Sequence, residues 1–169
     1  MNKDIAALRD IALFRNLTSE KIQRIMDILR KVTFSADEII MREGDIGDTM
    51  YIILEGTVEI AKNLVIDDTD NEDSGMNKVF TRLDGAQHAV VGEIALLEEQ
   101  KRTASVKAVT DCVMYEMKKD DFLKVAEKDY ELGYRILLNL GRIVSARLRR
   151  ADEDTMKLTT ALSIMLHEA

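Results

Sequence analysis

Residues 32–117 form a series of short apolar segments separated by turns, and this pattern limits the possible folds most strongly. Segments such as 38–42 and 50–54 have the length of a strand and are too short for an isolated helix. Glycine-rich turns follow them at 43–48 and 55–56. Short strands separated by glycine turns predict an antiparallel β-roll or barrel. The same pattern predicts further strands at 32–34, 57–60, 77–83, 103–109 and 112–117.

Helical patterns precede the strand region. Residues 20–30 are amphipathic, and Thr18 or Ser19 can cap a helix that begins there, because a hydroxyl oxygen accepts from the free N–H groups of the first turn. Residues 1–13 predict another, weakly amphipathic helix. Its apolar face would consist of Ile5, Leu8, Ile11 and Ala12.

Helical patterns also follow the strand region. A short helix is predicted over 119–127, and one long helix or two abutting helices over 130–167. Apolar residues recur every seven positions in the second stretch, which predicts a coiled-coil-like seam that packs on the strand region or on a second copy of the chain. The seam residues are Leu137, Val144, Ala151, Leu158 and Met165. The predicted organisation is an N-terminal helical segment, a β-roll and C-terminal helices at residues 1–31, 32–118 and 119–169.

Residues 91–106 carry the most informative chemistry. Gly92 and Glu93 stand near the start of this stretch, Arg102 stands near its end, and the apolar run 94–97 between them is typical of one buried helical turn. A carboxylate only accepts hydrogen bonds and suits ribose hydroxyls, whereas the planar fork of an arginine suits a phosphate. Backbone N–H groups at the start of the turn would add donors for the same anion. The stretch therefore predicts a site for a small nucleotide with a phosphate and a free ribose hydroxyl.

The segments Gly92-Glu93-Ile94-Ala95-Leu96 and Arg102-Thr103-Ala104 resemble the phosphate-binding cassette of the cyclic-nucleotide-binding domain family. The resemblance implies an α+β fold, in which an antiparallel β-roll (a double-stranded β-helix, or jelly roll) is flanked by N-terminal helices and a long C-terminal helix. It implies cAMP, or cGMP as the alternative, as the ligand and no metal. The implied ligand contacts in the cassette are Gly92, Glu93, Ile94, Ala95, Arg102, Thr103 and Ala104.

The contact with the nucleotide base is the least defined part of the resemblance. The family positions that reach the base from the long helix correspond here to Ala151 and Asp152. Asp152 can accept a hydrogen bond from an adenine amino group or from guanine N–H groups, whereas the Ala151 side chain cannot hydrogen-bond. A shift of the alignment would bring Thr155 into this place. The base identity stays open, with Asp152 as the candidate contact.

Three glycines of the strand region also resemble family positions. Gly44, Gly47 and Gly56 match structural glycines, and we expect their backbones to need a positive φ. They are interpreted as turn residues and not as ligand contacts.

Composition excludes several other functions. The net charge of −7 argues against nucleic-acid binding, which needs basic surface to displace counterions. The single cysteine, Cys112, allows no intrachain disulfide, and without a long apolar run or signal peptide we expect a cytoplasmic protein that does not enter membranes. Acidic residues 67–75 lack the spacing of a calcium loop and predict a mobile hairpin loop. No catalytic triad, metal cluster or Walker loop supports an enzyme.

The favoured interpretation is a regulatory module that binds a cyclic nucleotide and signals to an effector protein through the C-terminal helix. The resemblance implies a homodimer through that helix. Bacterial transcription factors of this family continue into a helix-turn-helix domain, and the sequence ends at Ala169, too early for one. The alternative is a ligand-free structural module for dimerisation or docking, with a degenerate pocket.

Overall fold

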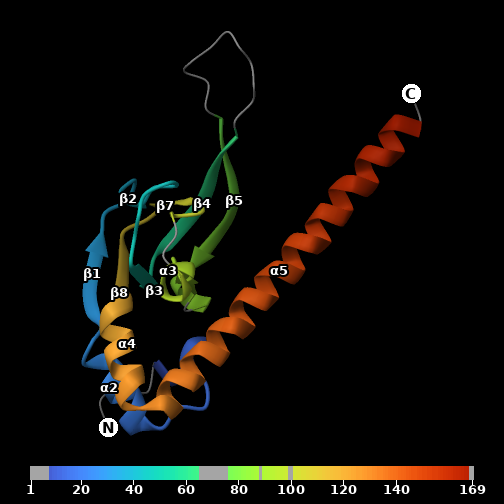
Figure 1. The fold of residues 1–169 in the computed structure, drawn as a ribbon. Helices are drawn as coiled ribbons and strands as arrows, with labels where there is room; N and C mark the ends of the chain where they lie inside the picture. Colours follow the sequence, from blue (N-terminus) through green and yellow to red (C-terminus); the bar gives the residue numbers. More distant parts are fainter. Residues whose placement is uncertain (1–7, 65–75, 88, 99–100, 168–169) are drawn as a thin grey trace.

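The protein folds into a β-roll with helices at one end, and a long C-terminal helix extends away from the roll (Figure 1). The structure is a computed structural model that describes residues 8–64, 76–87, 89–98 and 101–167, without the side chains of 63–64, 76–80 and 87. The predicted fold class is therefore confirmed. The acidic loop predicted at 67–75 lies outside the described residues.

Two four-stranded antiparallel sheets form the roll. The first sheet has the strand order β1-β8-β3-β6, and the second has the order β2-β7-β4-β5. Strands that are distant in sequence are thus neighbours, which brings residues 90–91 and 105–108 into one roll. The strands are β1 Arg30–Phe34, β2 Ile39–Met41, β3 Thr49–Glu55, β4 Thr57–Leu64, β5 Met76–Asp84, β6 Val90–Val91, β7 Ser105–Ala108 and β8 Cys112–Lys118.

The sequence of strand β3 is continuously apolar rather than alternating, because both faces of the strand are buried. Met50 and Ile52 pack in the core under the helices, whereas Tyr51 and Ile53 pack in the interior of the roll. All four side chains are at most 8% exposed. A strand covered on both faces needs apolar residues at every position, because neither face meets water.

The helices at the N-terminal side are shorter than predicted. Helix α2 spans Ser19–Met26 and is capped by Thr18, whose Oγ1 accepts from the Lys21 N–H at 3.3 Å, so the predicted cap is confirmed. The prediction that this helix continues to residue 30 is wrong, because β1 begins at Arg30. A 3₁₀ helix, η1, spans Ala12–Phe14.

The predicted helix over 1–13 is only partly described, and residues 1–7 lie outside the description. Leu8 and Ile11 are buried as predicted, whereas Ala12 is exposed. The tighter 3₁₀ turn places both Leu13 and Phe14 in the core, which leaves Ala12 on the outside.

Two helices follow the roll. Helix α4 spans Lys119–Lys128, and helix α5 is one continuous helix over Tyr130–His167. Only the first part of α5 packs on the body, through buried residues that include Leu132, Ile136 and Leu140. Every described residue from 148 to 167 is exposed. The second half of α5 therefore stands free of its own chain, as Figure 1 shows.

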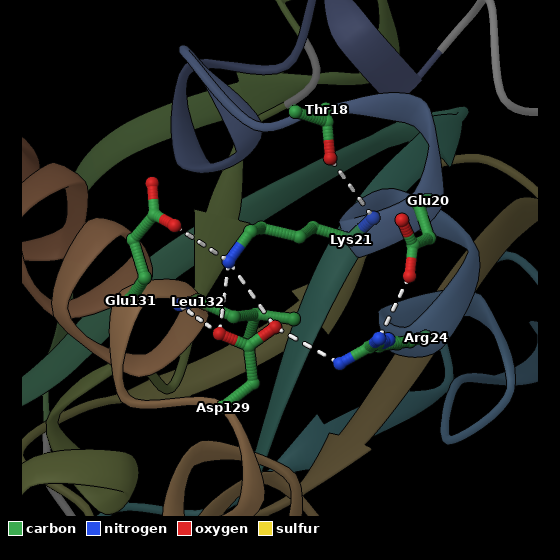
Figure 2. A network of polar contacts seen from close by, with 7 residues as sticks. All are labelled: Thr18, Glu20, Lys21, Arg24, Asp129, Glu131 and Leu132. Carbon is green, nitrogen blue, oxygen red and sulfur yellow. Dashed lines mark hydrogen bonds and ion pairs between the residues drawn. The ribbon is translucent and has the colours of Figure 1, made fainter.

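Asp129 lies between α4 and α5 and contacts both α2 and the start of α5 (Figure 2). Its Oδ1 accepts hydrogen bonds from Lys21 Nζ at 2.8 Å and from the Leu132 N–H at 3.0 Å, and its Oδ2 accepts from Arg24 Nη1 at 3.0 Å. Only 14% of its side chain is exposed. The hydrogen bond from Lys21 is the main cause that lowers the pKa of Asp129. Asp129 thus caps α5 and attaches α2 to the start of that helix.

We expect Asp129→Asn to remove part of the acid sensitivity of the fold. A carboxyl group with a pKa lowered by folding stabilises the protein above its unfolded pKa of about 3.9, and this contribution is lost as the pH falls through the lowered folded pKa. The asparagine can still cap α5 but cannot titrate. Thermal unfolding between pH 7 and pH 2 should therefore show a smaller loss of stability toward acid in the variant. Asp154→Asn, at an exposed pair with Lys157, serves as the control. An identical acid dependence in Asp129→Asn and the wild type would contradict this role.

Candidate functional site

A cavity of about 200 Å³ lies at the edge of the roll, beside helix α3 (Ile94–Leu97). All seven cassette residues predicted as ligand contacts line it. The chain also brings three residues from elsewhere to this wall: Met41 from β2, Ile60 from β4 and Arg147 from α5. The described residues that line it are Met41, Ile60, Val91, Gly92, Glu93, Ile94, Ala95, Lys101, Arg102, Thr103, Ala104, Val106 and Arg147.

The cassette has the local structure predicted from its sequence. Strand β6 before it pairs with β3, and strand β7 after it pairs with β2 and β4. Helix α3 forms the single helical turn between them, and its Ala95 and Leu96 are buried. Gly92 has φ +72°, and a Cβ there would lie 2.8 Å from Arg102 Nη1. The chain can turn into α3 here because glycine fits both the conformation and the space.

Glu93 is one of the two polar residues that are buried in the described chain. Its side chain is 9% exposed, and its Oε1 accepts a hydrogen bond of 2.5 Å from Arg147 Nη1. The second nitrogen of this guanidinium, Nη2, donates to the Val90 carbonyl at 2.6 Å. The Arg147 side chain is 34% exposed. Its two hydrogen bonds join α5 to the cassette at the edge of the cavity.

The role of Arg147 was missed in the sequence. A charge run such as 147–154 predicts a mostly solvated helix flank, and residues 148–154 are exposed, but its first residue, Arg147, pairs with Glu93. Neighbouring charges on a helix give no sign of a partner far away in the chain. The only available signal was the acid Glu93 itself, because a buried carboxylate needs a donor or a positive charge close by.

Arg102 is held by the first residue of β3 and by the turn before that strand. Its Nη1 donates to the Thr49 carbonyl at 2.7 Å and to the Gly92 carbonyl at 3.5 Å, and its Nη2 donates to Thr49 Oγ1 at 2.9 Å. Its backbone N–H donates to the Asp45 carbonyl at 2.7 Å. Within the described part of the chain, the side-chain contacts use three of the five N–H donors of the guanidinium, so two donors can serve an anion.

The expectation that backbone N–H groups at the start of the turn serve an anion needs a correction for Ala95. The Ala95 N–H donates to the Gly92 carbonyl at 3.1 Å, as the first bond of the tight turn. This amide is therefore already satisfied inside the protein. Positive charge at the site comes instead from the side chains of Arg102, Lys101 and Arg147, which all line the cavity.

The predicted base contact lies away from the cavity. Asp152, Ala151 and Thr155 are exposed on the free half of α5, and none of them lines the cavity. Thr155 Oγ1 donates to the Ala151 carbonyl at 2.8 Å, within the helix. The residue of α5 that reaches the cavity is Arg147, which is more than one helical turn before Asp152.

Two of the three structural glycines have the predicted backbone. Gly44 has φ +86° and Gly56 has φ +89°, whereas Gly47 does not have a positive φ, so the prediction for Gly47 is wrong. A side chain at Gly47 would clash with Arg102, because a Cβ there would lie 2.6 Å from Cζ of that arginine. Gly47 therefore makes room for the guanidinium.

We expect Gly47→Ala to weaken anion binding at the cavity with little loss of stability. The added methyl group must push the flexible end of Arg102 away, because 2.6 Å is far below contact distance. Loss of one charge-assisted hydrogen bond of about 1.5 kcal/mol corresponds to roughly tenfold weaker binding. Titration calorimetry with cAMP and cGMP measures this effect.

Gly44→Ala provides the matched control for Gly47→Ala. No atom of the described residues lies within 4 Å of a Cβ at this position, but the positive φ disfavours alanine. We therefore expect Gly44→Ala to lower stability more than it lowers affinity. Equal affinity of Gly47→Ala and the wild type would contradict the idea that Gly47 makes room for Arg102.

Comparison with known proteins finds a matching family model and related sequences. The family model described as "Cyclic nucleotide-binding domain" matches residues 31–129. The chain is 30% identical over 117 residues to a cGMP-dependent protein kinase of Drosophila melanogaster, and 33% identical over 103 residues to the cAMP-dependent protein kinase regulatory subunit of Schizosaccharomyces pombe. These matches cover 69% and 61% of this chain, but only 9% and 22% of the two relatives. The chain thus spans a small part of the curated relatives it matches.

Solved structures share the fold. The catabolite activator protein of Thermus thermophilus superimposes with a TM-score of 0.72 at 24% identity, over 88% of this chain and 63% of that one. A cyclic nucleotide-binding domain from Methylobacillus flagellatus superimposes with a TM-score of 0.75 at 19% identity, over 89% and 83%. Among the described residues, no helix could span a membrane, and no group of three or more metal-ligating side chains is found.

Proposed function

The chain belongs to the cyclic nucleotide-binding domain family, and from this premise we propose that it is a regulatory module that binds cAMP, with cGMP as the alternative. Relatives named for each of the two nucleotides support both choices. The proposal is a binding function and includes no catalytic step.

The observation that carries the proposal is the presence of Glu93 and Arg102 on the wall of one cavity. Arg102 has two N–H donors left for the cyclic phosphate, and the buried Glu93 carboxylate can accept from the ribose hydroxyl. Gly92, Ile94, Ala95, Thr103 and Ala104 complete the proposed contact surface.

The size of the cavity suggests how much of the ligand it holds. A volume of about 200 Å³ is below the roughly 300–1,000 Å³ of typical small-molecule sites. We assign the sugar and the cyclic phosphate to this cavity and the purine to its outer side. Asp152 remains the proposed base contact, which requires that the free half of α5 moves toward the ligand.

The proposed signal is a shift between two positions of α5. A ligand can shift this equilibrium only by its difference in affinity for the two positions. The cavity supplies a physical basis for such a difference, because Arg147 of α5 and the cassette share its wall. Ligand contacts with Glu93 and Arg102 would tighten α3 and repack α5, and an effector protein would detect the new position.

We also propose a homodimer through α5. The seam residues Leu158 and Met165 are 67% and 68% exposed, and Leu148, from an adjacent column of the helix, is 61% exposed. Apolar side chains at a heptad spacing on a free helix fit a two-stranded coiled coil. Sedimentation equilibrium tests this proposal, and a monomer at micromolar concentration would contradict it.

Titration calorimetry with cAMP and with cGMP tests the ligand. We expect saturable binding of at least one of them at one site per chain. 5′-AMP, which has the same base and ribose but an open phosphate, should bind more weakly. If neither cyclic nucleotide binds, the ligand-free docking module becomes the better interpretation.

A further inference from the structure

A second cavity, of about 200 Å³, lies where three parts of the chain meet, and none of the described cassette residues lines it. Its wall includes Leu13 of η1, Leu83 of β5 and Val90 of β6, together with one face of α5. We call it the joint cavity, because α5 joins the N-terminal segment and the roll there. A ligand in this cavity would contact all three parts at once.

One face of α5 contributes to the joint cavity. The α5 residues in its wall are Ile143, Ala146, Arg147 and Arg150. They are three or four positions apart, so they lie on the same side of the helix. The seam residues proposed for the dimer are not among the described residues of this wall. A dimer through that seam therefore does not require the joint cavity to close.

The wall of the joint cavity is apolar except for two arginines, Arg147 and Arg150. All other described residues that line it are alanine, valine, leucine or isoleucine, and none of the described lining residues is acidic. This cavity is thus positive in a chain whose net charge is −7. Apolar walls with a few polar groups that fix the orientation are typical of small-molecule sites. The combination favours a ligand with an apolar body and one negative group.

Arg150 is the residue that is available for the negative group. The guanidinium of Arg147 already donates to the Glu93 carboxylate and to the Val90 carbonyl. Arg150, by contrast, is exposed and forms no hydrogen bond or ion pair in the part of the chain that the structure describes. The planar fork of a guanidinium matches the two oxygens of a carboxylate with two parallel hydrogen bonds. A carboxylate at the open side of the cavity would therefore complete the pairing of Arg150.

The volume of the joint cavity limits the size of the apolar body. An apolar cavity of roughly 150 Å³ is large enough for benzene, so about 200 Å³ holds a body of roughly six carbon atoms. The aliphatic chain of hexanoate has this size. Typical small-molecule sites measure roughly 300–1,000 Å³, so the joint cavity is too small to enclose a purine nucleotide.

We propose that the joint cavity is a binding site for a small monocarboxylate with an apolar body of about six carbon atoms. Arg150 binds its carboxylate, and the walls from η1, the roll and α5 enclose its apolar body. Because the ligand contacts all three parts, it stabilises the position of α5 that the structure shows. This site goes beyond the proposed function, and its occupancy does not require a cyclic nucleotide.

Hexanoate is the probe, titrated into the full chain and followed by two-dimensional amide NMR spectra. We expect saturable shifts at Leu13, Ala146 and Arg150, with a dissociation constant of roughly 1 mM or lower, which a ligand of about eight non-hydrogen atoms can reach. Acetate has the charge without most of the apolar body and should bind roughly 100-fold more weakly. Hexan-1-ol has the body without the charge and should bind about tenfold more weakly.

Arg150→Met tests the assignment of the carboxylate. The variant lacks the guanidinium, so hexanoate should bind about tenfold more weakly, whereas the affinity for hexan-1-ol should not change. Arg149→Met, at the neighbouring exposed position outside the joint cavity, is the matched control and should bind hexanoate as the wild type does. Ala146→Leu fills the cavity and should abolish the binding of both compounds.

Two results would overturn the site. One is the absence of saturable shifts in the wild type at hexanoate concentrations far above the expected dissociation constant. The other is equal affinity of Arg150→Met and Arg149→Met for hexanoate. Neither result affects the proposed function, because titration with cAMP and cGMP tests that function separately.

Discussion

Arg102→Met is expected to weaken the binding of cAMP or cGMP by about 100-fold or more. The substitution removes both N–H donors that remain for the cyclic phosphate, and each hydrogen bond to a charged group contributes about 1.5–3 kcal/mol. A loss of about 3 kcal/mol corresponds to roughly two orders of magnitude in the dissociation constant. Titration calorimetry measures the change.

Two further variants separate the arginine fork from charge alone. Arg102→Lys keeps the positive charge but loses the planar fork, so its affinity should lie between those of the wild type and Arg102→Met. Arg82→Met, at an exposed position whose arginine pairs with Glu59, is the control for a lost surface charge. Wild-type affinity in Arg102→Met would contradict the assignment of the phosphate to this side chain.

Asn139→Leu is expected to lower the free energy of unfolding by about 2–4 kcal/mol. Asn139 is 4% exposed, and its Nδ2 donates to the carbonyls of Leu13 at 3.0 Å and Arg15 at 2.8 Å. Leucine has a similar size but no donor, so both carbonyls lose their partner while the helix stays intact. The effect should therefore come from the N-terminal segment, whose carbonyls the Asn139 side chain joins to α5.

Urea unfolding followed by circular dichroism tests the role of Asn139. The midpoint should fall with little change in the denaturant slope, which indicates lower stability rather than a different unfolded state. Arg149→Leu, at an exposed position on the same helix, should change stability by about 0.5 kcal/mol or less. A change in Asn139→Leu no larger than in this control would contradict the account of the attachment.

The parts of the structure that depend on local sequence were predictable. The strands follow from short apolar runs between turns, and α3 follows from the apolar run 94–97 between a glycine and a charged loop. The cap of α2 follows from Thr18, because a hydroxyl before an amphipathic run satisfies a free N–H group. In each case the residues that cause the structure are neighbours in the chain.

The contacts that join distant parts of the chain were not predictable in the same way. Arg147 and Glu93 are 54 positions apart, and a solvated arginine and one that pairs with a buried acid have the same sequence signature. Gly47 was assigned to a positive φ, but its reason is the Arg102 side chain, which only the folded structure brings near. The sequence gives a weak indication of the buried contact of Asn139, because this polar residue interrupts the apolar helix face formed by Ile136, Leu140 and Ile143.

The central claim is that Arg102 and Glu93 bind a cyclic nucleotide. The most direct test is a crystal structure from crystals grown with saturating cAMP or cGMP. We predict the cyclic phosphate within hydrogen-bonding distance of the Arg102 guanidinium, and the ribose hydroxyl within hydrogen-bonding distance of the Glu93 carboxylate. An empty cassette at saturating nucleotide, or a nucleotide bound without contact to Glu93 and Arg102, would contradict it.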